Sequence, residues 1–201
     1  IKIYDGDDNL ARTLLDAQPR QTGTHQESWN GKDNNKDMVL DGRYYFIIED
    51  STGGQTGVDR AALDVAIQLG MPHGGWCPSG RRAEDGGIDA IYTLQETVSR
   101  DYPCRTKWNV RDSDATLILH LGVPEGGTAY TIRCTEQLHK PCLSINLSLQ
   151  PDTREALEWL DKNEVTILNI AGPRESKQPG IYRNAYDFLM RLFGNTTPVT
   201  W

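Results

Sequence analysis

From about residue 43 onward, apolar and polar positions follow two alternating periods, which predict strands and helices in turn. Strand-like apolar runs occupy residues 44–48, 73–77, 115–120, 142–147 and 164–170. Helical periodicity marks residues 58–69, 126–140 and 181–193, and Asp152 with Glu155 forms a capping box at the start of a further helix. This alternation predicts an α/β domain over residues 43–201, with a doubly wound, mostly parallel, Rossmann-like sheet and helices on both faces.

The first 42 residues have a different texture. They are rich in Asp, Asn, Gln and Gly, with a long polar run over residues 26–36. Only residues 1–4 and 10–15 have the apolar content that ordered structure needs. We interpret residues 1–42 as an N-terminal extension of unknown role, and a flexible arm or appended sequence fits the composition equally well.

Charge and composition exclude several classes of protein. The 201 residues carry a net charge of −7, whereas broad nucleic-acid or anionic-membrane binding needs a basic face. No apolar run is long enough to span a bilayer, and no signal peptide opens the chain. The four cysteines lack C-x-x-C pairing and the four histidines lack ligand spacing. We therefore expect a cytoplasmic protein with reduced thiols, no membrane segment, no nucleic-acid partner and no metal site.

A glycine-rich turn over residues 53–57 separates the predicted strand 44–48 from the predicted helix 58–69. Glycines at such a turn let the backbone approach a ligand, and the N–H groups of the following helix favour an anion there. The spacing is neither the dinucleotide fingerprint nor a Walker loop, since no Gly-Lys-Ser/Thr follows. A tight turn without a ligand explains the pattern equally well.

Parallel sheets bind ligands beyond the carboxyl ends of their strands, which gathers four unusual loops at one rim. The loops are residues 53–57, 79–82, 124–128 and 171–177, and they carry the cations Arg81, Arg82, Arg174 and Lys177. A single arginine in such a loop is best read as a solvated surface charge. Four converging segments instead favour a site for a polyanionic small ligand.

Several other residues have plain structural explanations. Trp76 fits a core position as well as a pocket for a flat ligand, and Glu84 and Asp85 beside Arg82 fit a loop salt bridge. Asp112 is better read as a local cap or ion-pair partner than as an acid or base. No Ser-His-Asp, Cys-His or paired-carboxylate arrangement stands out, so the sequence favours binding over covalent catalysis and indicates no catalytic residue.

Four long segments resemble the molybdenum (molybdenum-cofactor) carrier protein family: residues 53–64, 75–86, 105–116 and 168–182. They occur in order across residues 44–194. The first 42 residues have no counterpart, and residues 49–52 are an unusual approach to the glycine turn. The family lies within a Rossmann-like superfamily of lysine-decarboxylase-like (LOG-type) domains.

Phosphoribohydrolases of that superfamily carry a P-G-G-x-G-T-x-x-E motif. The related segment here is Pro-Glu-Gly-Gly-Thr-Ala-Tyr-Thr at residues 124–131, so Thr131 stands where the glutamate would be. A threonine cannot perform the acid/base work of a carboxylate, which argues against that activity. The phosphate cradle, formed by backbone N–H groups of Gly127 and Thr128 with two hydroxyls, is retained.

The resemblance implies a carrier that binds the molybdenum cofactor (molybdopterin), or phosphate or another anion in its absence. It also implies a homo-oligomer, with molybdoenzymes as acceptors. The residues expected to hold the ligand are Gly53, Gly54, Gln55, Thr56, Gly57, Arg60, Trp76, Ser79, Arg81, Arg82, Gly126, Gly127, Thr128, Thr131, Arg174, Ser176 and Lys177. The alternative is a nucleotide-derivative sensor or phosphoribohydrolase-like enzyme, for which Asp59, Glu125 and Asp112 are the candidate acids or bases.

Overall fold

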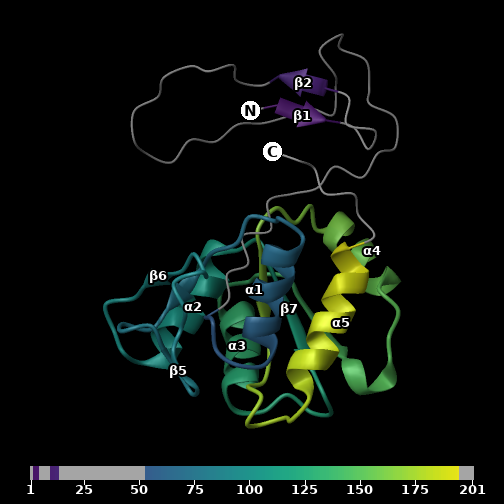
Figure 1. The fold of residues 1–201 in the computed structure, drawn as a ribbon. Helices are drawn as coiled ribbons and strands as arrows, with labels where there is room; N and C mark the ends of the chain where they lie inside the picture. The colour runs from purple at the N-terminus through teal and green to yellow at the C-terminus, as the bar shows by residue number, and fades with distance from the viewer. Residues whose placement is uncertain (1, 5–9, 14–52, 195–201) are drawn as a thin grey trace. The chain divides into compact units, whose positions relative to one another are not determined.

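The computed structural model describes residues 2–4, 10–13 and 53–194 (Figure 1). The chain divides into two units, residues 46–195 and residues 1–45 with 196–201. In the smaller unit, β1 (Lys2–Tyr4) pairs antiparallel with β2 (Leu10–Thr13). The predicted strand at residues 44–48 and the predicted boundary after residue 42 lie outside the described residues, and the role of the extension stays a prediction.

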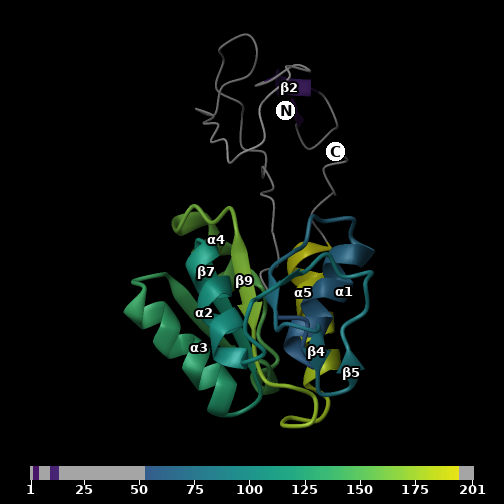
Figure 2. The ribbon, with the colours of Figure 1, turned by 90° about the vertical axis from the view of Figure 1, so that its left-hand side faces the viewer.

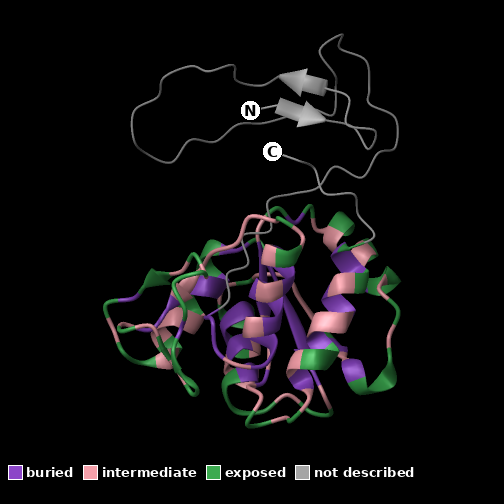
Figure 3. Ribbon diagram, in the orientation of Figure 1, coloured by how far each residue is buried: buried purple, intermediate pink, exposed green. Residues whose placement is uncertain are grey.

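The larger unit is built on a parallel sheet with the strand order β8-β7-β9. The strands are β7 (Ala115–His120), β8 (Cys142–Asn146) and β9 (Leu168–Ala171), and Leu117 in β7 lies opposite Leu143 and Ile170. All six residues of β7 are buried, as a continuous apolar run in a parallel sheet predicts (Figure 3). The carboxyl ends of the three strands therefore meet at one edge.

Helices cover both faces of this sheet (Figure 2). On one face α1 (Val58–Gln68) packs against α5 (Ile181–Phe193), and on the other α2 (Tyr102–Asp112) packs against α3 (Gly126–Gln137). A fifth helix, α4 (Arg154–Lys162), follows the short 3₁₀ helix η1 (Leu147–Leu149). The mixed α/β arrangement with parallel strands confirms the predicted Rossmann-like class.

The long periodic elements follow the sequence pattern closely. The predicted helix 181–193 is α5 with the same bounds, and five of its apolar residues are fully or almost fully buried: Ile181, Ala185, Phe188, Leu189 and Leu192. The predicted helix 58–69 is α1, and the predicted strand 115–120 is β7. These elements form one hydrophobic core between the sheet and the helices on the α1–α5 face.

Two predicted strands are shorter than expected, each for a local reason. The strand predicted at 73–77 is reduced to β3 (Trp76–Cys77), because Gly75 has a φ of 123° and the N–H of Trp76 donates to the Asn109 side chain at 2.7 Å. The strand predicted at 164–170 begins only at Leu168, because Glu164 has a left-handed φ of 49°. The N–H groups of residues 166 and 167 donate to the carboxylate of Asp114 instead.

Among the described residues, β3 pairs with β6 (Gln95–Glu96), outside the β8-β7-β9 sheet. A small hairpin of β4 (Arg82–Ala83) and β5 (Gly86–Gly87) lies between them in the chain. The expectation that the strand at 73–77 belongs to the main sheet is thus wrong for the described pairing. Its following loop nevertheless reaches the same rim through side chains, as described below.

Helix boundaries also differ in places. Helix α3 ends at Gln137, ahead of the predicted end at 140, because the N–H of Lys140 turns back to the carbonyl of Thr135 at 2.9 Å. Helix α4 begins at Arg154 with Thr153 as its N-cap and without a side-chain capping hydrogen bond, so the cap predicted at Asp152 lies one residue too early. Asp152 still accepts the N–H of Arg154 at 2.9 Å.

Helix α2 is absent from the sequence prediction, and it proves important for the site. Only Asn109 and Val110 among its residues are buried, so the apolar stripe that marks an amphipathic helix is too weak to detect. The remaining signal is Pro103 in the first turn. Within the described part of the chain, no helix has the length and apolar character needed to cross a membrane.

Candidate functional site

The glycine turn at residues 53–57 is packed against the protein itself. A Cβ atom on Gly53 would lie 1.8 Å from Nη1 of Arg105, and one on Gly57 would lie 2.2 Å from the carbonyl oxygen of Pro173. Gly57 also has a φ of 80°, and the N–H of Val58 donates to Pro173 at 3.2 Å. The close approach that these glycines allow is therefore used by Arg105 and by the loop after β9.

A carboxylate joins two of the four predicted loops. Glu84, from the hairpin between β4 and β5, accepts hydrogen bonds from the hydroxyls of Thr56 and Ser176. The N–H of Ser176 donates to the same carboxylate at 3.2 Å, and the N–H of Glu175 donates to the Thr56 hydroxyl at 3.3 Å. Partial burial alone would raise the pKa of Glu84, but the bonds from Ser176 and Thr56 and the charge of Arg174 hold it below its usual value. We call Thr56, Glu84 and Ser176 the loop cluster.

Two arginines that the sequence assigned to the ligand are bonded within the protein. The guanidinium of Arg81 donates to four backbone carbonyls of the loop that follows it. The guanidinium of Arg60 donates to the carbonyl of Gly54 at 3.0 Å and forms an ion pair with Asp85 at 3.2 Å. These contacts of the two arginines fix the conformation of the 81–94 loop and of the glycine turn.

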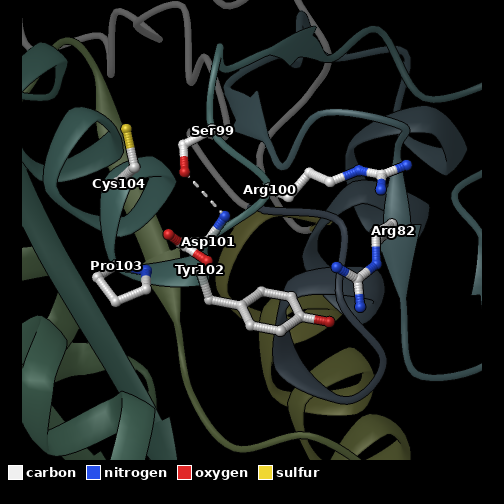
Figure 4. Close-up of a pocket in the computed structure, with 7 residues that line it drawn as sticks. All are labelled: Arg82, Ser99, Arg100, Asp101, Tyr102, Pro103 and Cys104. Atoms are coloured by element: carbon white, nitrogen blue, oxygen red, sulfur yellow. Dashed lines mark hydrogen bonds between the residues drawn. The ribbon is translucent and has the colours of Figure 1, made fainter.

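An open pocket of about 600 Å³ lies at the start of α2. It is lined by Arg82, Arg100 and Tyr102 together with Ser99, Asp101, Pro103 and Cys104. Figure 4 shows the phenol ring of Tyr102 extending from the start of α2 toward Arg82, with Arg100 on the same side. The pocket therefore combines an aromatic ring with two exposed guanidinium groups.

Arg174 joins this pocket to the loop after β9. Its guanidinium carbon lies 4.4 Å from the centroid of the Tyr102 ring, which is a cation–π contact. Among the ion pairs recorded for the described residues, none involves Arg82, Arg100 or Arg174. In a chain with a net charge of −7, Arg82, Arg100 and Arg174 concentrate positive charge around the Tyr102 ring, and Asp101 is the carboxylate that lines the pocket with them.

The start of α3 presents open backbone at the carboxyl end of β7. Gly126 has a φ of 54°, and a Cβ atom added at Gly126 or Gly127 would meet nothing within 4 Å. No backbone acceptor is recorded for the N–H groups of these two glycines within residues 53–194. Thr128 is buried, and the Thr131 hydroxyl donates to the carbonyl of Gly127 at 3.0 Å. This turn, unlike the one at 53–57, leaves space for a ligand at a helix N-terminus.

The α3 loop and the β9 loop are tied together at the same edge. The side chain of Gln178 accepts from the N–H of Leu121 at 2.8 Å and donates to its carbonyl at 2.6 Å. Contacts among the described residues therefore link the glycine turn, the Glu84 hairpin, the segment that follows β7 and the β9 loop.

Trp76 lies away from this rim. Its indole N–H donates to Asp112 at 2.8 Å, and its ring makes an edge contact with Trp108 at a centroid distance of 4.7 Å. Both partners belong to the C-terminal half of α2, whereas Tyr102 begins it, so about 15 Å of helix separates the two ends. Ser79 donates its N–H to the carbonyl of Ser99 at 3.0 Å, and Lys177 is exposed.

The candidate acids and bases of the enzyme alternative differ in their surroundings. Asp59 is buried and pairs with Arg105 at 3.0 Å. Hydrogen bonds from Arg111 lower the pKa of Asp112 despite its partial burial, and Trp76 adds to the effect. Glu125 is exposed at the N-cap of α3. Within the described residues, no group of three or more His, Cys, Asp or Glu side chains is placed to hold a metal ion.

Of the seven residues that line the pocket, the sequence predicted only Arg82 as a site residue, and the six that it missed include Arg100 and Tyr102. Tyr102 directly precedes Pro103 and Arg100 lies three residues before it, so a predicted helix start there would have drawn attention to them. Arg105, which packs against Gly53, was also missed as a supporting residue because it comes from the helix that the pattern did not reveal.

Comparison with known proteins bears directly on this geometry. Residues 51–193 match the model of a family described as circularly permutated YpsA SLOG. A crystal structure named "Putative molybdenum carrier protein", from Syntrophus aciditrophicus SB, is 44% identical, with a TM-score of 0.69. The match covers 74% of this chain and 96% of that one. No curated protein matches the chain significantly. The resemblance seen in the sequence is confirmed, and the chain belongs to the circularly permutated YpsA SLOG family.

Proposed function

We propose that this protein binds a small phosphate-bearing ligand at the carboxyl edge of its sheet, and that the ligand is the molybdenum cofactor, held as cargo. The observation that carries the proposal is the pocket at the start of α2, where Arg82 and Arg100 flank Tyr102 and Arg174 stacks on the same ring. Guanidinium groups are the side chains best suited to a phosphate, because their planar fork donates two parallel hydrogen bonds.

The residues at the rim suit the parts of such a cargo. The N–H groups of Gly126 and Gly127 would be donors for a phosphate, and both glycines are exposed, with nothing within 4 Å of an added Cβ. Tyr102, rather than Trp76, is the aromatic side chain at the pocket and so the candidate for contact with a flat ring. A resident metal ion is not part of the proposal, since the protein would hold its cargo by the phosphate and the ring.

The choice of cargo rests on the relative. The crystal structure that is 44% identical to this chain carries the name of a molybdenum carrier protein, and its sequence is covered almost completely by the match. We extend this to a cytoplasmic homo-oligomeric carrier that delivers its cargo to molybdoenzymes. Light scattering tests the oligomer, and a monomer at all concentrations would contradict that part.

Anaerobic incubation with isolated cofactor, followed by gel filtration and metal analysis, tests the proposed cargo. We expect molybdenum to elute with the wild-type protein and to be largely lost from the variant Arg174→Ala. Arg183→Ala is the matched control, because Arg183 is exposed on α5 and pairs only with Asp187 within that helix. No molybdenum with the wild-type protein would remove the cofactor from the proposal.

The second candidate is an enzyme or sensor for nucleotide derivatives. The observation that favours it is the exposed carboxylate of Glu125, which stands directly before the open backbone of Gly126. A screen of nucleoside monophosphates for released base decides between the two. Steady release that is lost in Glu125→Gln would favour the enzyme, whereas no release leaves the carrier as the better explanation.

A further inference from the structure

The loop cluster contains hydrogen-bond donors of the kind that bind an anion, and the carboxylate of Glu84 accepts from them. The hydroxyls of Thr56 and Ser176 and the N–H of Ser176 all point at Glu84. The three donors come from the two loops that precede α1 and follow β9, so they would remain at the rim without the carboxylate. A phosphate accepts the same kind of donors and carries the same sign of charge.

The backbone around Glu84 is held by contacts that do not involve its carboxylate. Its own N–H donates to the side chain of Gln55 at 2.8 Å, and Asp85 pairs with Arg60. The guanidinium of Arg81 fixes the returning strand, with a bond of 2.9 Å to the carbonyl of Ile88. The hairpin can therefore keep its place when the Glu84 side chain turns away.

Resting on the proposed function, we propose that Glu84 is an exchangeable internal anion, which occupies the donors of Thr56 and Ser176 until the phosphate of a ligand displaces it. The carboxylate and a phosphate cannot share these donors, because two anions in contact repel each other. The residue is exposed at the surface, so the released side chain can turn into water.

Two features of the surroundings fit such an exchange. The charge of Arg174 acts on Glu84, while the Arg174 guanidinium stacks on Tyr102 at the edge of the pocket. The same arginine can therefore stabilise either anion. The hydrogen bonds that hold the carboxylate lower its pKa, so it is charged, and competes as an anion, under ordinary conditions. The exchange would couple ligand binding to the position of this side chain.

Calorimetric titration with inorganic phosphate tests the proposal on the full-length chain. Glu84→Ala frees the donors and removes the competing charge, so we expect phosphate to bind roughly tenfold more tightly than to the wild type. Glu84→Gln keeps the acceptor oxygen without the charge and should lie between the two. Glu158→Ala is the matched control, because it removes an exposed carboxylate on α4, outside the loop cluster, and should change the affinity by no more than about twofold.

A second readout guards against a folding defect. In nitrogen–proton correlation spectra, the amide signal of Ser176 should shift in Glu84→Ala, and added phosphate should shift it further at lower concentration than in the wild type. Equal or weaker phosphate binding by a folded Glu84→Ala protein overturns the exchange. If Arg174→Ala still weakens phosphate binding in that case, the proposed function stands without it, whereas no phosphate binding in any variant overturns both.

Discussion

Substitution of Arg81 tests most sharply whether an arginine at the rim has a structural or a ligand-binding role. The Arg81 guanidinium donates to the carbonyls of Ile88 at 2.9 Å, Asp89 at 2.6 Å, Tyr92 at 2.9 Å and Leu94 at 3.2 Å. Truncation to alanine removes the guanidinium donor from four carbonyls of one loop, of which only those of Asp89 and Tyr92 keep a recorded backbone N–H donor among the described residues. We therefore expect Arg81→Ala to lower the stability of the domain.

The size of the loss follows from the bonds and their exposure. A hydrogen bond to a charged group contributes about 1.5–3 kcal/mol, but the contributions of one side chain do not add fully. Water can reach part of this loop and replace some of the bonds, so we expect a total loss of about 3 kcal/mol. For a domain of this size that corresponds to a fall in Tm of roughly 6–12 °C. Arg81→Lys should recover only part, because an ammonium group cannot reach four carbonyls at once.

Thermal unfolding followed by circular dichroism measures this effect, and Arg82→Ala is the control. Arg82 is the next residue, but it is exposed and lines the pocket. Its truncation should change Tm by no more than about 2 °C, the range of an ordinary surface substitution, while it weakens phosphate binding. An unchanged Tm in Arg81→Ala, together with weaker phosphate binding, would refute the structural role and return Arg81 to the ligand.

Three further outcomes are expected. Arg174→Ala should weaken phosphate binding by about tenfold, and more than Thr128→Ala, because a bidentate guanidinium contact is stronger than a neutral hydrogen bond. Titration calorimetry measures both losses, and Arg174→Lys should restore part of the affinity. Equal losses in the two alanine variants would contradict the prediction. Gly57→Ala should lower the free energy of unfolding by more than about 2 kcal/mol, because its φ is 80° and a Cβ would lie 2.2 Å from a carbonyl oxygen. Urea unfolding measures the loss and should show almost no change in the control Gly87→Ala, where a Cβ meets nothing within 4 Å. The pKa of Glu84 lies below its usual value of 4.5, so its contribution to stability is present above that pH and is lost as the pH falls through the folded-state pKa. The stability of Glu84→Gln should therefore fall less steeply below pH 4.5 than that of the wild type. Parallel curves of stability against pH would count against this prediction.

The regular parts of the fold could be predicted because their patterns are long and one-sided. Helix α5 buries six apolar residues, and β7 has four apolar residues among six, so the hydrophobic pattern alone sets their bounds. Helix α2 could not be predicted in this way, because only two of its residues are buried. Its position between the sheet and the pocket is set by tertiary packing, which no local sequence pattern contains.

The sequence grouped loops of the candidate site, but it did not show the contacts between them. The rule that ligands bind beyond the carboxyl ends of parallel strands grouped the glycine turn with the β9 loop, and the structure links these two through Glu84. It could not distinguish Arg81, which serves four carbonyls, from Arg82, which faces the pocket one residue later. Nor could it show that Glu84 reaches Thr56 and Ser176, since residues 28 and 92 positions apart meet only in the folded chain.

The central claim is that an anion binds at the carboxyl edge of the sheet, between the start of α3, the pocket of α2 and the β9 loop. Nitrogen–proton correlation spectra recorded during a titration with inorganic phosphate test it most directly, because they report each amide separately. The account predicts the largest shifts at Gly126, Gly127 and Ser176, with saturation at one concentration. Shifts confined to the surroundings of Trp76 and Trp108, or none at any concentration, would contradict it.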